Sequence, residues 1–263
     1  MRRGDYPTGE SLGVRAATKD TILKAIEQKE TRDKAEAKAV IMFLKDSGLR
    51  ASDLRRLNYG DIREPLERDD NFIQITMITQ KVKTTAKTFI GEEAIRALKE
   101  YLGARRKGSR RIPPETITDK SPLFRTWESH TAQRIPRGTI STVVRTAFLR
   151  IGEKHLSAHS LRKYLQTSLE AANVNPNWID QILGHKLINS RDAYSKPTDE
   201  QLCEAYVRAY NFIRVYPEVE VSTAQARDIE PETLISGEEY TASRATYEHT
   251  VTIEGTEIFR KRK

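Results

Sequence analysis

The chain has 263 residues, of which 37% are hydrophobic and 31% charged, and its formal net charge is +8. That length suffices for one large domain or two small ones with a proper core, and no stretch approaches the roughly 18–20 apolar residues of a membrane span. The only cysteine, Cys203, excludes a disulfide framework and a multi-cysteine metal site. The composition predicts a soluble protein of a reducing, intracellular compartment, with no membrane partner.

The charge is distributed unevenly along the chain. From residue 217 onward there are ten Asp and Glu against six Lys and Arg, four of which form the terminal RKRK. The first 216 residues therefore hold 39 Lys and Arg against 27 Asp and Glu, a net charge of +12. A folded region this basic favours a polyanionic partner such as nucleic acid, although a solubilising surface would give the same count.

Helical signals dominate the first 60 residues. Residues 1–17 contain Gly and Pro but no apolar h-region, so they predict a leader or linker and not a secretory signal. Helices are predicted over 18–28 and 32–46, and Gly48 ends the second one. Ser52 is then the predicted N-cap of a short helix, SDLRRLN.

The pattern changes to that of strands after the predicted polar loop EPLERDD, which ends at residue 70. Residues 71–80 (NFIQITMITQ) are rich in β-branched side chains and predict a strand, with its partner at 87–91 (KTFIG) across the turn segment KVKTTA. A helix is predicted over 92–106. The basic, proline-containing segment 107–136 predicts a long connector.

Helical periodicity returns in the second half of the chain. It runs through 140–151 and through SAHSLRKYLQTSLEAANV, which Ser157 can cap. Asn175-Pro176 begins a helix that stops at Gly184, and a capping box at 198–201 begins the next one.

These elements predict a mainly α fold with a small antiparallel β-sheet, of the α+β class. We expect a leader or linker over 1–17, a folded domain over 18–214, and an acidic tail over 215–263 with a small hairpin around Glu254-Gly255.

His159 and Arg162 are the first candidate functional residues of the domain. Their spacing of three places both on one helix face, opposite the apolar stripe. A guanidinium can grip two phosphate oxygens, and an imidazole can handle a proton. Taken alone, such a pair is more often an ordinary surface pair.

Two more cationic positions lie at predicted turns. Arg50 is held between Gly48 and Ser52, and Asp53 could brace it. Lys83 lies in the turn of the predicted hairpin, where a lysine can reach a phosphate or donate a proton. Its neighbours Lys81 and Lys87 could take the same role.

The last two candidates follow the glycine stop of the helix that begins at Asn175-Pro176. His185 comes directly after that glycine, and Tyr194 follows nine residues later in SRDAYSKP. By itself a tyrosine is more often part of the core than a nucleophile, and the chain has ten of them.

The order of these residues resembles the catalytic domain of the tyrosine recombinases, the phage-integrase family. SGLRASDLRRLNYGDI resembles the family's first arginine box and KVKTTAKTFIG its hairpin lysine segment. HSLRKYLQTSL resembles its His-x-x-Arg box and ILGHKLINSRDAYSKP its final box. The resemblance covers about residues 18–213 and implies the catalytic set Arg50, Lys83, His159, Arg162, His185 and Tyr194, with Asp53 beside Arg50.

The resemblance implies a site-specific DNA recombinase, or integrase, that works without metal, cofactor or ATP. Arg50, Arg162 and His185 would meet the charge that builds on the phosphate oxygens. Tyr194 would attack and form a 3′-phosphotyrosine bond. His159 would accept its proton or orient the phosphate, and Lys83 would protonate the leaving 5′ oxygen.

The resemblance also implies the partners. We expect duplex DNA with a specific recombination site, a homotetramer on that DNA with a free monomer, and a cytoplasmic protein of a prokaryotic cell or virus-infected host, of mobile-element or viral type. The predicted phosphate contacts are Arg105, Arg106, Lys107, Arg110, Arg111, Arg134 and Arg137. Alternatives are a type IB topoisomerase-like enzyme and a catalytically silent DNA-binding protein of the same fold.

The two ends of the chain depart from the family pattern. Family members usually carry an amino-terminal DNA-clamping domain, whereas only seventeen residues precede the first predicted helix here. We therefore expect either a catalytic-domain fragment or an unusually minimal enzyme. The apolar stripe from Leu202 to Ile213 would pack on its own domain or on a neighbouring protomer.

Overall fold

The computed structural model describes residues 15–27, 34–108, 113–126, 133–186 and 197–217, and the backbone of three strands after residue 217. The chain divides into two units at the junction of Tyr216 and Pro217. In the ranges given above, every helix is too short or too polar to cross a membrane.

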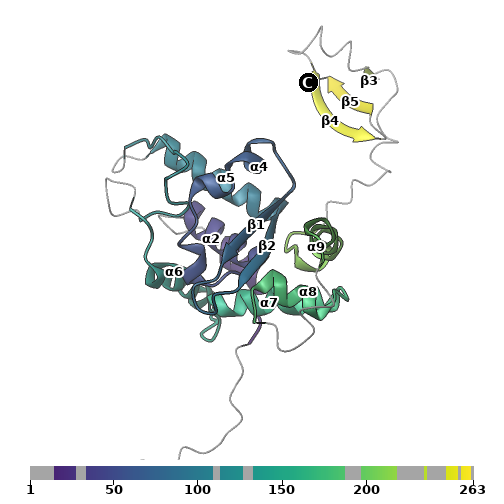
Figure 1. The fold of residues 1–263 in the computed structure, drawn as a ribbon. Helices are drawn as coiled ribbons and strands as arrows, with labels where there is room; N and C mark the ends of the chain where they lie inside the picture. The colour runs from purple at the N-terminus through teal and green to yellow at the C-terminus, as the bar shows by residue number, and fades with distance from the viewer. Residues whose placement is uncertain are drawn as a thin grey trace, which may run out of the picture. The chain divides into compact units, whose positions relative to one another are not determined.

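The first unit consists of helices around one two-stranded sheet (Figure 1), so the predicted fold class is confirmed. The helices in chain order are α1 (Lys19–Glu27), α2 (Lys34–Ser47), α3 (Ala51–Leu54), the 3-10 turn η1 (Tyr59–Asp61), α4 (Arg63–Glu67), α5 (Glu92–Lys107), α6 (Arg137–Arg150), α7 (Ala158–Ala171), α8 (Pro176–Leu183) and α9 (Asp199–Ile213).

The sheet of the first unit is an antiparallel hairpin of β1 (Phe72–Ile78) and β2 (Thr85–Gly91), paired from Phe72 opposite Gly91 to Ile78 opposite Thr85. On β1, Ile73 and Ile75 are buried whereas Ile78 near the turn is exposed. This alternation is the period of two that a half-buried strand requires.

The second unit is a separate antiparallel sheet. Its strands are β3 (Leu234–Ile235), β4 (Tyr247–Ile253) and β5 (Thr256–Lys261), in the order β3-β5-β4.

Two hydrophobic clusters hold the first unit together. The larger surrounds α2, in which five successive side chains from Val40 to Leu44 are fully buried. The smaller joins β2 to α7, α8 and α9 through side chains such as Phe89, Leu165 and Tyr206. The predicted catalytic residues that the structure describes lie on elements of both clusters or next to them.

Helix α9 packs on its own domain, which decides between the two alternatives left by its apolar stripe. Leu202, Tyr206 and Ile213 are fully buried in the smaller cluster. Its last turn also meets buried polar groups, because Lys45 Nζ donates to the Ile213 carbonyl at 3.2 Å. Glu93, itself ion-paired with Lys45 at 2.8 Å, accepts the main-chain N–H groups that follow the helix.

Local capping begins and ends the helices around the site. Asn175 Oδ1 accepts the Asn177 N–H at 2.9 Å with Pro176 in the first helical position, as predicted. Helix α8 ends at Gly184 in the left-handed region, with φ 64°. A Cβ there would lie 2.7 Å from the side chains of Thr79 and Ala86, so glycine is needed for both conformation and space.

Two local predictions are wrong. Ser52 is not an N-cap, because the Arg50 carbonyl already accepts the N–H groups of Asp53 and Leu54, and α3 begins at Ala51 with Arg50 in the N-cap position. The segment EPLERDD is not only a polar loop, since its first half belongs to α4. Leu66 is buried in the core and gives this short helix an apolar anchor.

Candidate active site

Arg162 is the central residue of the candidate site. Its side chain is buried, with the residue 4% exposed, so it does not lie on the polar helix face that its spacing predicted. Nη1 donates to the Gly48 carbonyl at 2.6 Å, and Nη2 donates to the Leu183 carbonyl at 2.7 Å. One guanidinium thus joins α7 to the turn before α3 and to the end of α8.

Arg50 lies beside Arg162 and is positioned by a tight turn at Gly48. The turn that carries it begins at Gly48, whose φ of 59° lies in the left-handed region. A Cβ on Gly48 would lie 2.7 Å from Leu183 and 2.8 Å from Leu165, so the close approach of α7 and α8 requires glycine. Arg50 Nη1 is buried and has no hydrogen-bond partner among the described residues.

The charges of the two arginines and the two histidines act on one another. Burial, and then the charge of Arg50, lowers the pKa of Arg162 to about 10. Burial, and then the charges of Arg162 and Arg50, lowers the pKa of His159, with a further contribution from His185. The site is therefore a cluster of positive potential in which His159 is neutral at neutral pH.

Asp180 fixes the second histidine, a role that the sequence analysis missed. His185 Nδ1 lies 2.8 Å from Asp180 Oδ1, and the His185 N–H donates to the Asp180 carbonyl at 2.9 Å. An Nδ1–H donated to this carboxylate leaves Nε2 free to face a ligand. An acidic residue one turn before a glycine helix stop and a histidine was the available signal.

The hairpin turn brings Lys83 toward the same site. Lys83 is exposed and has a φ of 61°, which is unusual for a residue with a side chain. Thr84, the next residue, donates its hydroxyl to the Gly184 carbonyl at 2.8 Å, so the turn is tied to the residue before His185. Lys87 is occupied elsewhere, because its Nζ pairs with Asp199 at 2.6 Å.

Asp53 holds the hairpin instead of pairing with Arg50. Its Oδ1 accepts the Gln80 N–H at 2.7 Å, and the side chain is fully buried. Arg56 adds a second tie, from Nη1 to the Ile78 carbonyl at 2.7 Å. Helix α3 and the hairpin turn therefore form one rigid corner, which fixes Arg50 relative to Lys83.

Tyr194 lies outside the described residues, in the segment 187–196. Both described flanks of that segment are attached to the hairpin. Gly184 accepts the Thr84 hydroxyl, and Asp199 pairs with Lys87 beyond the buried Pro197. The described residues on either side of the segment that carries the predicted nucleophile are thus attached to the hairpin turn and to β2.

The predicted phosphate contacts fall into several groups. Arg105 was wrongly assigned, because it is 2% exposed and pairs with Glu115 at 2.6 Å while donating to two main-chain carbonyls. Arg134 is half-buried and donates to main-chain and Asn58 oxygens. Arg106 is exposed and lies over the Tyr59 ring. Lys107 and Arg137 are exposed, and Arg110 and Arg111 lie outside the described residues.

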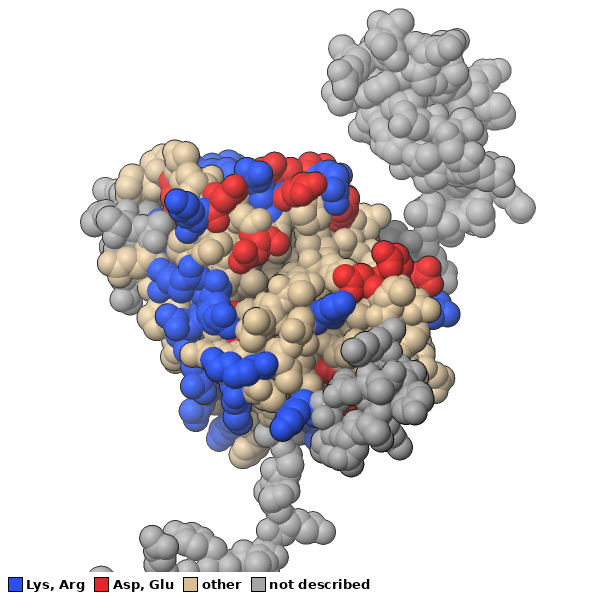
Figure 2. Space-filling view, in the orientation of Figure 1, with Lys and Arg blue, Asp and Glu red and all other residues tan. Residues whose placement is uncertain are grey.

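Charges of the two signs gather on different parts of the surface in Figure 2. Lys and Arg form a band over the region of α6, whereas Asp and Glu gather over α4, α5 and the start of α9. On α6 the exposed cations are Arg137, Arg145 and Arg150. The basic band is the surface of this view that suits a polyanion.

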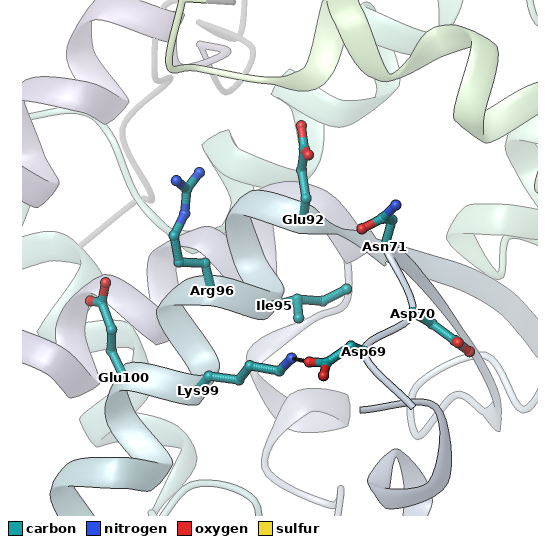
Figure 3. A pocket seen from close by; sticks show the side chains of 8 residues that line it. All are labelled: Asp69, Asp70, Asn71, Glu92, Ile95, Arg96, Lys99 and Glu100. Carbon is teal, nitrogen blue, oxygen red and sulfur yellow. Dashed lines mark hydrogen bonds and ion pairs between the residues drawn. The ribbon is translucent and has the colours of Figure 1, made fainter. Parts of the chain in front are cut away.

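The hollow of about 530 Å³ beside α5 does not belong to this site. Figure 3 shows Lys99 pointing to Asp69, with which it forms an ion pair along one edge of the hollow, while Glu92, Arg96 and Glu100 line the rest of it. Its lining holds four carboxylates and two cations, so it is unsuited to a phosphate. In the portion of the chain that is described, no cluster of three or more His, Cys, Asp or Glu could hold a metal ion.

Residues 15–201 match the model of the Phage integrase family. Among curated proteins, the tyrosine recombinase XerC of Caldanaerobacter subterraneus subsp. tengcongensis is 29% identical over 170 residues, which are 64% of this chain and 43% of that protein. The chain spans about half the length of the curated relatives it matches.

Solved structures share the fold. The XerA recombinase matches with a TM-score of 0.52 and 23% identity, over 77% of this chain and 66% of that one. A XerH site-specific recombinase, solved with its palindromic difH substrate as a post-cleavage complex, matches with a TM-score of 0.51 and 18% identity, over 71% and 49% of the two chains.

Proposed function

The chain belongs to the phage integrase family, and from that premise we propose that it cleaves and rejoins duplex DNA at a specific recombination site through a 3′-phosphotyrosine intermediate. The observation that carries the proposal is Arg50 Nη1, which is buried beside Arg162 and has no hydrogen-bond partner among the described residues. A guanidinium donor in that position suits an anionic acceptor, and a phosphodiester supplies one.

Each residue has a distinct role in the proposed step. The Tyr194 oxygen attacks phosphorus while the bond from phosphorus to the 5′ oxygen breaks. His159 accepts the phenolic proton, and Lys83 gives a proton to the departing 5′ oxygen. Arg50, Arg162 and His185 stabilise the charge on the non-bridging oxygens. The covalent link keeps the phosphodiester energy, so a 5′-hydroxyl of another strand can reverse the step.

The geometry supports this assignment of the acid and the base. Depression of the His159 pKa by burial and by the arginines keeps the imidazole neutral and able to take a proton. Lys83 is supported over Lys87 because Lys87 is ion-paired with Asp199. The post-cleavage complex of the XerH site-specific recombinase with its palindromic difH substrate supports DNA as the partner. Assembly as a homotetramer on the recombination site, from a monomer in free solution, is part of the same proposal.

The pH dependence tests the role of His159. Its pKa lies below the ordinary value of 6.5, so the rate of adduct formation should be constant near neutral pH and should fall only below about pH 6.5, as the imidazole gains a proton. The measurement is the single-turnover rate of covalent adduct formation against pH. In His159→Gln the rate should be lower and this acid limb absent; an unchanged acid limb would assign the proton acceptor to another group.

The lysine assignment is tested with a modified leaving group. Lys83→Ala should slow cleavage of a normal strand by about 100-fold, and a 5′-phosphorothiolate linkage, whose thiolate leaves without a proton, should restore the rate. Lys81→Ala and Lys87→Ala should cleave both substrates nearly normally. If the 5′-phosphorothiolate restored the cleavage rate only in Lys81→Ala or only in Lys87→Ala, that lysine would be the proton donor to the leaving oxygen.

Strand exchange separates the proposal from its alternatives. Incubation with two duplexes that share the site mapped from the adduct should produce recombinant strands. Relaxation of supercoiled DNA without sequence preference, and without exchange, would assign the chain to topoisomerase-like activity. DNA binding without any adduct would assign it to silent binding.

A further inference from the structure

A second cationic position, at the end of α3, remains unexplained by the proposed step. Arg55 directly follows α3, five residues beyond Arg50, and its Nε is buried without a hydrogen-bond partner among the described residues. Buried donors rarely lack a hydrogen bond in folded proteins, because an unsatisfied donor costs about 1–3 kcal/mol. The chemistry at Arg50 does not account for this nitrogen.

Arg134 lies against Arg55 and brings a second positive charge. Its Nη1 donates to the carbonyls of Arg55 at 2.6 Å and Leu57 at 3.0 Å, and its Nη2 donates to Asn58 Oδ1 at 2.5 Å. Burial, and then the charge of Arg55, lowers the pKa of Arg134, while Asp61 acts in the opposite direction. Two guanidinium groups therefore share one half-buried place.

This pair differs from the buried arginines Arg105 and Arg125. Arg105 and Arg125 share the carboxylate of Glu115, at 2.6 and 2.9 Å. In the described ranges, no carboxylate lies within ion-pair distance of Arg55 or Arg134. Like charges held together without a counter-ion repel each other, and a bound anion removes that repulsion.

The pair is held rigidly next to the active site. Arg56 ties the end of α3 to β1 through the Ile78 carbonyl, and Arg134 is fixed by its three acceptors. Arg50 and Arg55 flank the four-residue helix α3 at its two ends, so an anion held at Arg55 would lie close to one held at Arg50.

We propose that Arg55 and Arg134 form a second phosphate site, which grips a backbone phosphate of the DNA close to the scissile one. The identity of the anion as a DNA phosphate rests on the proposed function, whereas the anion site itself rests on the unpartnered, doubly cationic geometry. The contact would position the duplex and would carry no sequence information.

Salt dependence of binding tests this site without needing catalysis. In the Tyr194→Phe protein, Arg55→Ala should weaken binding equally for different duplex sequences and reduce the slope of log K against log salt by about 0.9, the value for one lost phosphate contact. Arg68→Ala is the matched control. Arg68 pairs with Glu64 and Asp70 away from this corner, so its slope should be unchanged.

Neutral linkages identify the phosphate. A scan of single methylphosphonates on both strands should find one position near the cleavage site that weakens binding of the Tyr194→Phe protein but has no further effect in Arg55→Ala. Arg134→Lys, which keeps a charge but loses the three-acceptor anchor, should show the same missing coupling. Thermal melting of each variant shows whether it is folded.

The outcomes separate the two proposals. An unchanged salt slope in folded Arg55→Ala, with no coupled phosphonate position, would overturn the second phosphate site even where the wild-type protein forms its covalent adduct. A reduced slope in a protein that never forms an adduct would retain the site and overturn the recombinase assignment.

Discussion

Replacing Arg162 with alanine is expected to reduce both activity and stability. The rate of adduct formation should fall about 100- to 1,000-fold, because one group that stabilises transition-state charge is lost. The free energy of unfolding should fall by about 1–3 kcal/mol, because the buried carbonyls of Gly48 and Leu183 lose their donors. Single-turnover cleavage and urea denaturation measure the two effects.

Arg162→Lys separates charge from geometry. Lysine keeps a positive charge but cannot span two carbonyls with a planar fork. We therefore expect much of the rate loss to persist. Wild-type activity in Arg162→Lys would show that position and charge suffice without the two-carbonyl anchor.

Arg50→Ala should produce a comparable rate loss without the loss of stability expected for Arg162→Ala. Its Nη1 makes no hydrogen bond among the described residues, and its charge opposes that of Arg162. Removing it should leave the free energy of unfolding unchanged or slightly higher, as at sites where function and stability conflict. The same two measurements apply, and a stability loss as large as that of Arg162→Ala would show that Arg50 is a structural residue.

The sequence was most informative where structure is decided locally. Asn175 with Pro176, Gly184 and Thr198 are start and stop signals that depend on a few neighbouring residues, and the helix boundaries they predict are found. The hairpin was also predictable, since β-branched alternation over 71–80 is a local pattern. The order of the chemistry-bearing residues along the chain then sufficed to indicate the family.

Burial of charged groups could not be predicted in the same way. Arg162 can be buried because two carbonyls from distant parts of the chain accept hydrogen bonds from its guanidinium group. Arg105 was mistaken for a surface cation because its partner, Glu115, lies in a connector without periodicity. The choice of Lys83 over Lys87 likewise depends on Asp199, 112 residues beyond Lys87 in sequence.

The most direct test of the central claim is covalent trapping. Wild-type protein and Tyr194→Phe are incubated with a pool of nicked duplexes in EDTA, and protein–DNA adducts are separated under denaturing conditions. We predict an adduct with the wild-type protein alone, linked through Tyr194 to a 3′-phosphate, with non-covalent DNA binding retained by Tyr194→Phe. An adduct of equal yield from Tyr194→Phe, or wild-type protein that binds every duplex and forms no adduct, would contradict the account.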